Sequence, residues 1–488
     1  MKSIFPLILL FLFAGCVSHA VYREAPLHAS PPYSSISPYP RLKEQLDALF
    51  PDSLFPPCSV GVKIRSLGTG ETLYEANPDL LFNPGSNQKL ITSAAAVILL
   101  GEDRLLTTRV SFDTTITPRI YLKGGGDPRL SDADLDLLAV VLAHNVPQGK
   151  QWTLAGDVSF FDDLPWGSGW MWDDEPDPTG MEISPLSVDG NAIRVHVRPG
   201  AAINDSVLVS TDPPTTYVTI ENDGITAPRD SARTLLVTRK WRDRSNVITV
   251  TGRLPLNDSL RTVDLSVWQP AWYALNLLKE RLEAKGISCL GTVMDTVPTT
   301  SIPAGELDHR LDSVLIYMNK TSDNLSAENL LKIMGATEGG LPGSAEQGIH
   351  AERSVLAGLG IDTAKLVIAD GSGVSRYNLV TASILVQLLT AMHDDGRHSR
   401  AYENSLPVAG VDGTLARRMR GTGAAGNLRA KTGTLQGASA LSGYVTTADG
   451  EQLVFAILMQ NFPGRAESYR IVQDRIGAFL SALQRKQF

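Results

Sequence analysis

The chain has 488 residues, of which 43% are hydrophobic, and a formal net charge of -8 at pH 7. This length and composition suffice for two or three hydrophobic cores. The acidic balance argues against a nucleic-acid partner, because phosphate binding needs a basic surface. The sequence contains neither a C-x-x-C pair nor an H-E-x-x-H motif, so we predict no zinc site and no cofactor.

The N-terminus predicts an export signal over residues 1–20. It combines a basic start at Lys2, an apolar stretch over residues 4–13 and a small-residue end. The tripeptide ending at Cys16 resembles a lipoprotein processing site, which would make Cys16 a lipidated N-terminus attached to a membrane. The alternative is ordinary signal cleavage after Ala20. Both cleavage modes place the mature chain outside the cytoplasm, in the periplasm.

A segment rich in proline and serine follows, and residues 21–41 are predicted to form a flexible tether. If Cys16 is processed, the remaining two cysteines are Cys58 and Cys289. They could form a disulfide in an oxidising compartment, although the sequence does not show that they meet.

The first candidate for chemistry is Ser86, which follows a proline–glycine break. Residues 90–100 are almost all apolar and end at Gly101, which predicts a buried helix. Lys89 would then project from the same helical face as Ser86, and burial could lower its pKa enough for it to act as a base. The alternative is that Ser86 only caps the helix and Lys89 extends to water.

About 230 residues separate Lys89 from the next motif, and a stretch of this size must form one or two domains of its own. Strands such as 119–122 and 247–251 alternate with helices such as 133–144 and 271–285. We predict an inserted α/β domain from residues 107–186 and 255–305, carrying a nested β-rich domain at 187–254. The remaining parts, 42–106 and 306–488, would form one discontinuous domain.

The second motif is Ser322-Asp323-Asn324, which lies between an apolar stretch at 315–318 and a predicted helix at 325–334. Serine, aspartate and asparagine are all favoured helix caps, so simple capping is the alternative interpretation. In the functional interpretation, Ser322 relays a proton and Asn324 hydrogen-bonds both Lys89 and a substrate carbonyl.

The third motif, Lys431-Thr432-Gly433, lies in the first of three predicted antiparallel strands, at 427–434, 438–446 and 452–460. A strand beside a cleft can pair with an extended peptide, while Lys431 and Thr432 offer charge and a hydroxyl to a terminal carboxylate. Gly433 leaves room for close approach. Taken alone, the threonine–glycine pair is also common turn chemistry.

Together the motifs have the order S-x-x-K, S-x-N and K-T-G, which is typical of penicillin-recognising serine enzymes. The chain resembles the D-alanyl-D-alanine carboxypeptidase/endopeptidase family of low-molecular-mass class C penicillin-binding proteins from about residue 42 to its end. Further segments similar to that family are residues 82–90, 122–128, 169–174 and 370–376. One departure is Gly85, where the family commonly has alanine.

The resemblance implies a role for each candidate residue. Ser86 would be acylated, Lys89 would be the general base and Ser322 would relay a proton to the leaving amine. Lys431 would keep its own proton, in order to hold the substrate carboxylate. The other expected substrate-binding residues are Asn324, Thr432, Gly433 and Thr434, with Asp173 and Arg376 beside the peptide's side chain. The backbone N–H groups of Ser86 and Thr434 would form the oxyanion hole.

The expected fold is mixed α/β (α+β), with an antiparallel sheet and a helix cluster like those of β-lactamases and transpeptidases. The leading functional hypothesis is an exported serine DD-peptidase, either carboxypeptidase or endopeptidase, that acts on peptidoglycan stem peptides and is acylated by β-lactams. A β-lactamase is the nearest alternative. The alternative outside enzymes is an idle protein that binds the cell wall or β-lactams. A Ser-His-Asp hydrolase is disfavoured, because no G-x-S-x-G motif occurs.

Overall fold

The computed structural model describes residues 35–51, 54–55 and 58–487. The predicted export signal and Cys16 lie outside these residues. The tether predicted over 21–41 overlaps ordered structure at its end, because β1 (Ser35–Ile36) pairs with β3 (Thr72–Ala76) and α1 (Pro40–Asp47) begins at Pro40. Proline is favoured in the first turn of a helix, where its missing N–H costs no hydrogen bond. The predicted mixed α/β class is confirmed.

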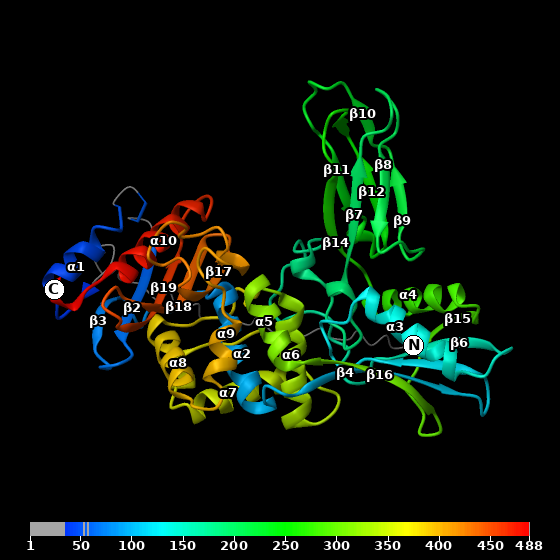
Figure 1. The fold of residues 1–488 in the computed structure, drawn as a ribbon, viewed down its shortest axis with the longest axis horizontal. Helices are drawn as coiled ribbons and strands as arrows, with labels where there is room; N and C mark the ends of the chain where they lie inside the picture. The colour runs from blue at the N-terminus through cyan, green and yellow to red at the C-terminus, as the bar shows by residue number, and fades with distance from the viewer. Residues whose placement is uncertain (1–34, 52–53, 56–57, 488) are drawn as a thin grey trace, which may run out of the picture.

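A six-stranded antiparallel sheet forms the centre of one half of the molecule, in the order β1-β3-β2-β19-β18-β17 (Figure 1). The predicted strands near the C-terminus are confirmed, with the bounds of two of them unchanged. The four longer strands are β2 (Ser59–Ser66), β17 (Arg429–Leu435), β18 (Ala438–Thr446) and β19 (Gln452–Gln460).

Both faces of this sheet are covered by helices, which explains the nearly continuous apolar sequence of β19. Leu453, Phe455 and Ile457 pack into a core that includes apolar residues of α1 and α10 (Glu467–Ala482). The alternate residues Val454 and Ala456 join the helix cluster on the other face. β17 is left at the open edge of the sheet.

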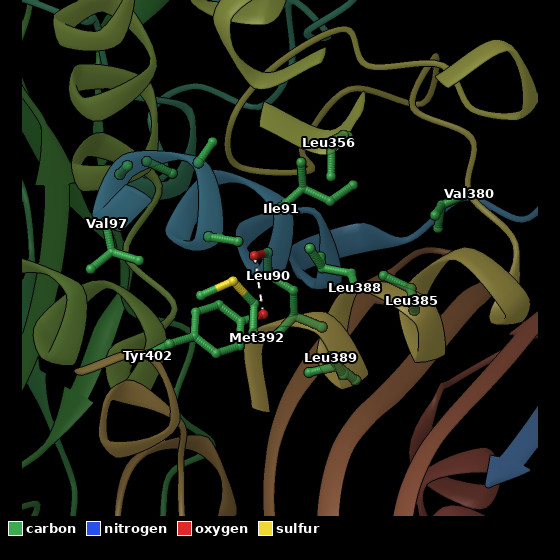
Figure 2. Close-up of a cluster of buried hydrophobic side chains, with 14 of the residues drawn as sticks. Leu90, Ile91, Val97, Leu356, Val380, Leu385, Leu388, Leu389, Met392 and Tyr402 are labelled. Carbon is green, nitrogen blue, oxygen red and sulfur yellow. Dashed lines mark hydrogen bonds between the residues drawn. The ribbon is translucent and has the colours of Figure 1, made fainter. Parts of the chain in front are cut away.

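The helix cluster surrounds α2 (Gln88–Leu100), whose residues from Gln88 to Val97 are all buried. Figure 2 shows Leu90 and Ile91 of α2 among side chains of the neighbouring helices, with the Tyr402 hydroxyl donating to the Leu90 carbonyl at 3.1 Å. Those helices are α5 (Leu311–Thr321), α6 (Asn324–Gly339), α7 (Ala345–Gly358), α8 (Ala382–Asp394) and α9 (Ser399–Ser405). The helices predicted from residues 90 and 325 are therefore confirmed.

The region between α2 and α5 forms a second mixed sheet in the order β15-β6-β5-β4-β16, with two helices packed on it. The predicted strand and helices near residues 119, 133 and 271 are all present. The elements are β4 (Leu105–Asp113), β5 (Arg119–Lys123), α3 (Asp132–Asn145), β6 (Gln151–Asp157), α4 (Pro270–Ala284), β15 (Ser288–Met294) and β16 (Ile302–Arg310).

A β-rich arm projects from this second sheet at the top of Figure 1 and consists of short sheets in the orders β14-β7-β8, β11-β12-β9 and β10-β13. Its strands are β7 (Ala192–Arg198), β8 (Leu208–Asp212), β9 (Thr219–Asn222), β10 (Ile225–Ala227), β11 (Leu236–Arg239), β12 (Val247–Thr251), β13 (Arg253–Pro255) and β14 (Arg261–Ser266). β14 pairs with β7 although it follows residue 254, the expected end of the nested domain. The expected limits at 106 and 306 likewise fall inside β4 and β16, which pair with each other.

The two cysteines do not form the disulfide considered above. Cys58 is a buried free thiol in the core beneath the first sheet, whereas Cys289 is a half-buried free thiol on β15. They belong to different cores, and no covalent bond can join them without large backbone movement. Within the described part of the chain, no helix is long and apolar enough to cross a membrane.

Candidate active site

Ser86 and Lys89 meet at the start of α2, as the i,i+3 spacing predicts. Ser86 lies in a short 3-10 turn, Gly85–Asn87, that runs directly into the helix. The Lys89 ammonium donates to the Ser86 hydroxyl oxygen at 3.1 Å. The helix-capping alternative has no support here, because the Ser86 side chain makes no cap hydrogen bond and the Lys89 side chain is fully buried.

Two more oxygen atoms surround the Lys89 ammonium. The Asn324 side-chain oxygen accepts at 2.6 Å and the Ser372 carbonyl oxygen accepts at 2.7 Å. Burial lowers the pKa of Lys89 to about 8, although the nearby carboxylates of Asp370, Asp323 and Glu328 act in the opposite direction. A lysine with such a pKa can take a proton from a serine hydroxyl near neutral pH.

The second motif joins α5 to α6. Ser322 ends α5 in the left-handed conformation, with φ of 65°, and Asp323 caps α6 by accepting from the Ser326 N–H at 2.7 Å. Asp323 therefore caps the helix, while the neighbouring Ser322 is free of that role. This junction directs Ser322 toward Lys431, whose ammonium donates to the Ser322 hydroxyl at 2.9 Å.

Lys431 is fully buried, and its surroundings differ from those of Lys89. Its other hydrogen bond is to the Thr432 carbonyl at 3.1 Å. Burial and then the charge of Lys89 lower the pKa of Lys431 well below its ordinary value. The expectation that Lys431 keeps its proton in order to hold a substrate carboxylate stays a prediction. A bound carboxylate would act against this lowering, because an opposite charge favours the ammonium form.

A cleft of about 510 Å³ runs beside the edge strand β17, and Ser86, Ser322 and Asn324 all line it. Thr432 and Thr434 line the cleft from β17. Gly433 lies between them, and a Cβ at this position would be 2.3 Å from the Pro84 carbonyl oxygen. Glycine is thus required for the close approach between β17 and the turn that carries Ser86.

Asp173 and Arg376 are not brought to this cleft. Asp173 is exposed, and the cleft wall contains the next residue, Asp174, instead. Arg376 is also exposed and donates to the Gln436 carbonyl at 3.1 Å, one residue beyond the last cleft residue on β17. Asp173 and Arg376 therefore lie outside the cleft wall, whereas Lys431 and Gly433 lie behind it on β17, next to residues that line the cleft.

Sequence reasoning missed two arginines that line the cleft, Arg418 and Arg470. Arg470 comes from α10 and donates to the Thr434 hydroxyl at 3.1 Å. Arg418 is held by Asp474 at 2.8 Å. Neither arginine belongs to a recognisable motif, and only the fold brings them beside β17. Their guanidinium groups give this end of the cleft a positive charge suited to a carboxylate.

Sequence reasoning also missed Glu328, a fully buried residue of α6. It accepts from the backbone N–H groups of Gly371 at 3.1 Å and Ser372 at 2.8 Å. Asp370 holds the same turn by accepting from the Gly373 N–H at 2.8 Å. These bonds fix the Ser372 carbonyl that receives the Lys89 ammonium. In the described ranges, no group of three or more His, Cys, Asp or Glu side chains is placed to hold a metal ion.

The site thus combines a serine, two buried lysines and an open strand edge, which defines a serine acyl-transfer enzyme of the penicillin-recognising class. The profile of the D-Ala-D-Ala carboxypeptidase 3 (S13) family matches residues 42–483, and the chain belongs to this family of serine D-Ala-D-Ala carboxypeptidases. The resemblance found in the sequence is thereby confirmed.

Two relatives agree with this assignment, and one solved structure shares the fold. The chain is 37% identical over 465 residues to the D-alanyl-D-alanine carboxypeptidase of an Actinomadura species, covering 90% of this chain and 84% of the relative. It is 26% identical to the penicillin-sensitive carboxypeptidase A of Dictyostelium discoideum, covering 85% of each chain. The fold is similar to that of penicillin binding protein 4 from Haemophilus influenzae, with a TM-score of 0.76, 23% identity, and coverage of 90% of this chain and 99% of that one.

Proposed function

We propose that the protein is an exported serine DD-peptidase that cleaves the D-Ala-D-Ala bond of peptidoglycan stem peptides through an acyl-enzyme on Ser86. One observation carries the proposal: the buried Lys89 ammonium lies 3.1 Å from the Ser86 hydroxyl and 2.6 Å from the Asn324 oxygen, and Ser86 and Asn324 line a cleft beside an edge strand. An extended peptide can pair with such a strand, and its terminal carboxylate would then face Lys431, Thr432 and the two arginines.

The chemical steps follow from these contacts. Lys89 takes the Ser86 proton as the hydroxyl oxygen attacks the carbonyl carbon, and backbone N–H groups of Ser86 and Thr434 stabilise the oxyanion. The C–N bond then breaks, and the proton that Lys89 took passes by way of Ser322 to the amine of the departing D-Ala. Water then gives a proton to Lys89 as its oxygen attacks the ester carbon, the bond from that carbon to the Ser86 oxygen breaks, and the proton returns from Lys89 to Ser86.

A comparison of two substrates tests this function. Purified protein is incubated with a monomeric pentapeptide and with a cross-linked dimer, and the products are weighed. Loss of one alanine from the pentapeptide shows carboxypeptidase activity, whereas conversion of the dimer to monomers shows endopeptidase activity. Failure to cleave either substrate would contradict the proposal.

Export and membrane attachment are part of the same proposal. Residues 1–20 support an export signal, and Cys16 supports attachment by lipid. Mass spectrometry of the mature N-terminal peptide would show either a lipidated Cys16 or a free N-terminus after Ala20. An uncleaved N-terminus that begins at Met1 would contradict both cleavage modes.

We expect peptidase activity to rise with pH through about 8, because the pKa of Lys89 is lowered to about 8 and only its neutral form can accept the Ser86 proton. At pH 7 about one tenth of Lys89 is then neutral, so kcat/KM should increase several-fold between pH 7 and 9. The pH dependence of kcat/KM measures this. A rate that falls over that interval would contradict Lys89 as the base.

The pH dependence of kcat/KM should shift to lower pH in the Glu328→Gln variant. Removing this carboxylate removes one charge that holds the pKa of Lys89 up, so the rise should begin at lower pH. The control is Glu338→Gln, an exposed change on the same helix. Equal profiles in all three proteins would show that Glu328 does not act on Lys89.

Penicillin is expected to acylate Ser86 and to remain bound. Its strained amide resembles the scissile bond, but the leaving group stays tethered after ring opening and obstructs the approach of water. Intact-mass analysis should show one penicillin per chain, and peptide mapping should place it on the peptide that contains Ser86. Rapid multiple turnover would instead indicate a β-lactamase, and absence of any adduct on folded protein would favour an idle binding protein.

A further inference from the structure

A second pocket, of about 370 Å³, lies between the segment at 166–180 and the β-rich arm. Five of the chain's seven tryptophans line it: Trp166, Trp170, Trp172, Trp241 and Trp268. Arg242 and Arg244 also line it. We call it the tryptophan pocket. None of the steps proposed above uses it.

The tryptophan pocket does not belong to a hydrophobic core. Trp166 is 42% exposed and Trp172 is 69% exposed, which is unusual for side chains of this size. The rings of Trp172 and Trp241 face each other at 5.4 Å with an interplanar angle of 32°. The Arg242 guanidinium lies 5.0 Å from the Trp241 ring and 5.8 Å from the Trp172 ring. Aromatic side chains gathered at an open concavity indicate a ligand site.

The pocket adjoins the catalytic cleft, because Asp174 lines both. Two hydrogen bonds fix the wall between them. The Trp170 indole N–H donates to Asp370 at 2.9 Å, and the Asn324 amide donates to the Thr179 carbonyl at 2.9 Å. A ligand in the tryptophan pocket would therefore stand in a fixed position relative to Ser86.

The composition of the pocket selects among ligand classes. Indole faces contact the C–H face of a pyranose ring, and guanidinium groups donate to acetamide carbonyl and hydroxyl oxygens. A cationic ligand is disfavoured, because the guanidinium groups of Arg242 and Arg244 line the same pocket and would repel it.

We propose that the tryptophan pocket binds an N-acetylated amino sugar of the peptidoglycan glycan strand, so that the substrate is held by its sugar end as well as by its peptide. The inference rests on the proposed function, in which a stem peptide occupies the neighbouring cleft. About four residues separate the sugar from the scissile bond, and an extended chain of that length spans roughly 14 Å. A stem peptide of this length can therefore extend from the tryptophan pocket into the neighbouring cleft, since Asp174 lines both.

The test compares one pentapeptide with the same pentapeptide attached to an N-acetylglucosaminyl-N-acetylmuramic acid disaccharide. The unmodified enzyme should show about tenfold higher kcat/KM for the disaccharide form, which corresponds to about 1.4 kcal/mol. The Trp172→Ala/Trp241→Ala double variant should lose this preference while its kcat/KM for the free pentapeptide changes less than about twofold. Leu290→Ala, at a 65% exposed site on β15, is the control and should retain the preference.

Several results would overturn the sugar assignment. They are equal kcat/KM for both substrates in the unmodified enzyme, a preference that persists in the double variant, and a parallel loss of both activities in a folded double variant, which would assign the pocket to the peptide. If the unmodified enzyme cleaves neither substrate, the proposed function fails instead. Titration with the disaccharide alone, followed by tryptophan fluorescence, then still tests the pocket: a saturable change that the double variant lacks supports it, and no change overturns it.

Discussion

The Ser86→Ala variant is expected to lose all peptidase turnover and all covalent labelling by penicillin, while folding normally. The substitution removes the attacking oxygen, and no other hydroxyl lies at the Lys89 ammonium at hydrogen-bond distance within the described residues. The hydroxyl makes one hydrogen bond, to Lys89, and no helix cap. Its loss should therefore cost stability by no more than about 1 kcal/mol. Pentapeptide hydrolysis, intact mass after penicillin treatment and thermal unfolding measure the three effects.

A serine-to-alanine change elsewhere distinguishes loss of the nucleophile from a general effect of the substitution on the protein. Ser354→Ala changes an exposed position on α7 and should leave turnover and labelling unaltered. Residual turnover above a few per cent in Ser86→Ala, with contaminating enzyme excluded, would show that the nucleophile is another residue.

Local sequence patterns predicted much of the catalytic half. The helix after Ser86 and the strands at 438–446 and 452–460 have the expected positions, because each is a long apolar segment with clear turn residues at its ends. The same patterns placed the helices near residues 133 and 271 in the insertion. In the β-rich arm the strand predicted at 247–251 has the bounds of β12, but its pairing with β9 and β11 could not be predicted from local patterns.

Parts of the site depend on contacts that no local pattern records. Arg470 reaches the cleft from the C-terminal helix α10, and Arg418 is held there by Asp474 of the same helix. Glu328 has the sequence context of an ordinary helix residue, and its role depends on the turn at 371–372, whose N–H groups donate to it. The resemblance placed Asp173 beside the substrate, whereas the structure gives the cleft wall to Asp174. Side-chain direction at a loop is set by tertiary packing and not by the neighbouring sequence.

The protonation of the two lysines could not be predicted either, because it depends on burial and on distant carboxylates. Both ammonium groups are buried, which lowers both pKa values. Asp370, Asp323 and Glu328 partly oppose this at Lys89, while Lys431 faces the positive charge of Lys89. A substrate carboxylate at Lys431 would raise the pKa of Lys431, because an opposite charge favours the ammonium form. The protons on the two lysines are therefore coupled to each other and to the bound substrate.

The Lys89→Arg variant is expected to lose acylation by about a thousandfold, within the range that a general base contributes. Arginine keeps the positive charge but stays protonated at every relevant pH, so it cannot take the Ser86 proton. The rate of penicillin labelling, followed by intact mass, measures acylation directly. The Lys89→Arg variant should also lack the rise in rate with pH that is expected for the unmodified enzyme.

Because the Lys89 site is fully buried, the larger guanidinium could disturb folding, and thermal unfolding is measured on the same samples. Lys89→Met, which fills similar volume without charge, provides a second variant that should also fail to acylate. Lys365→Arg, at a side chain that is 72% exposed, controls for the chemical change and should label at the normal rate. If folded Lys89→Arg or Lys89→Met is acylated at a near-normal rate, another group must be the base. Ser322 and Lys431 would then be the next pair to examine, because Ser322 lines the same cleft and accepts from the Lys431 ammonium at 2.9 Å.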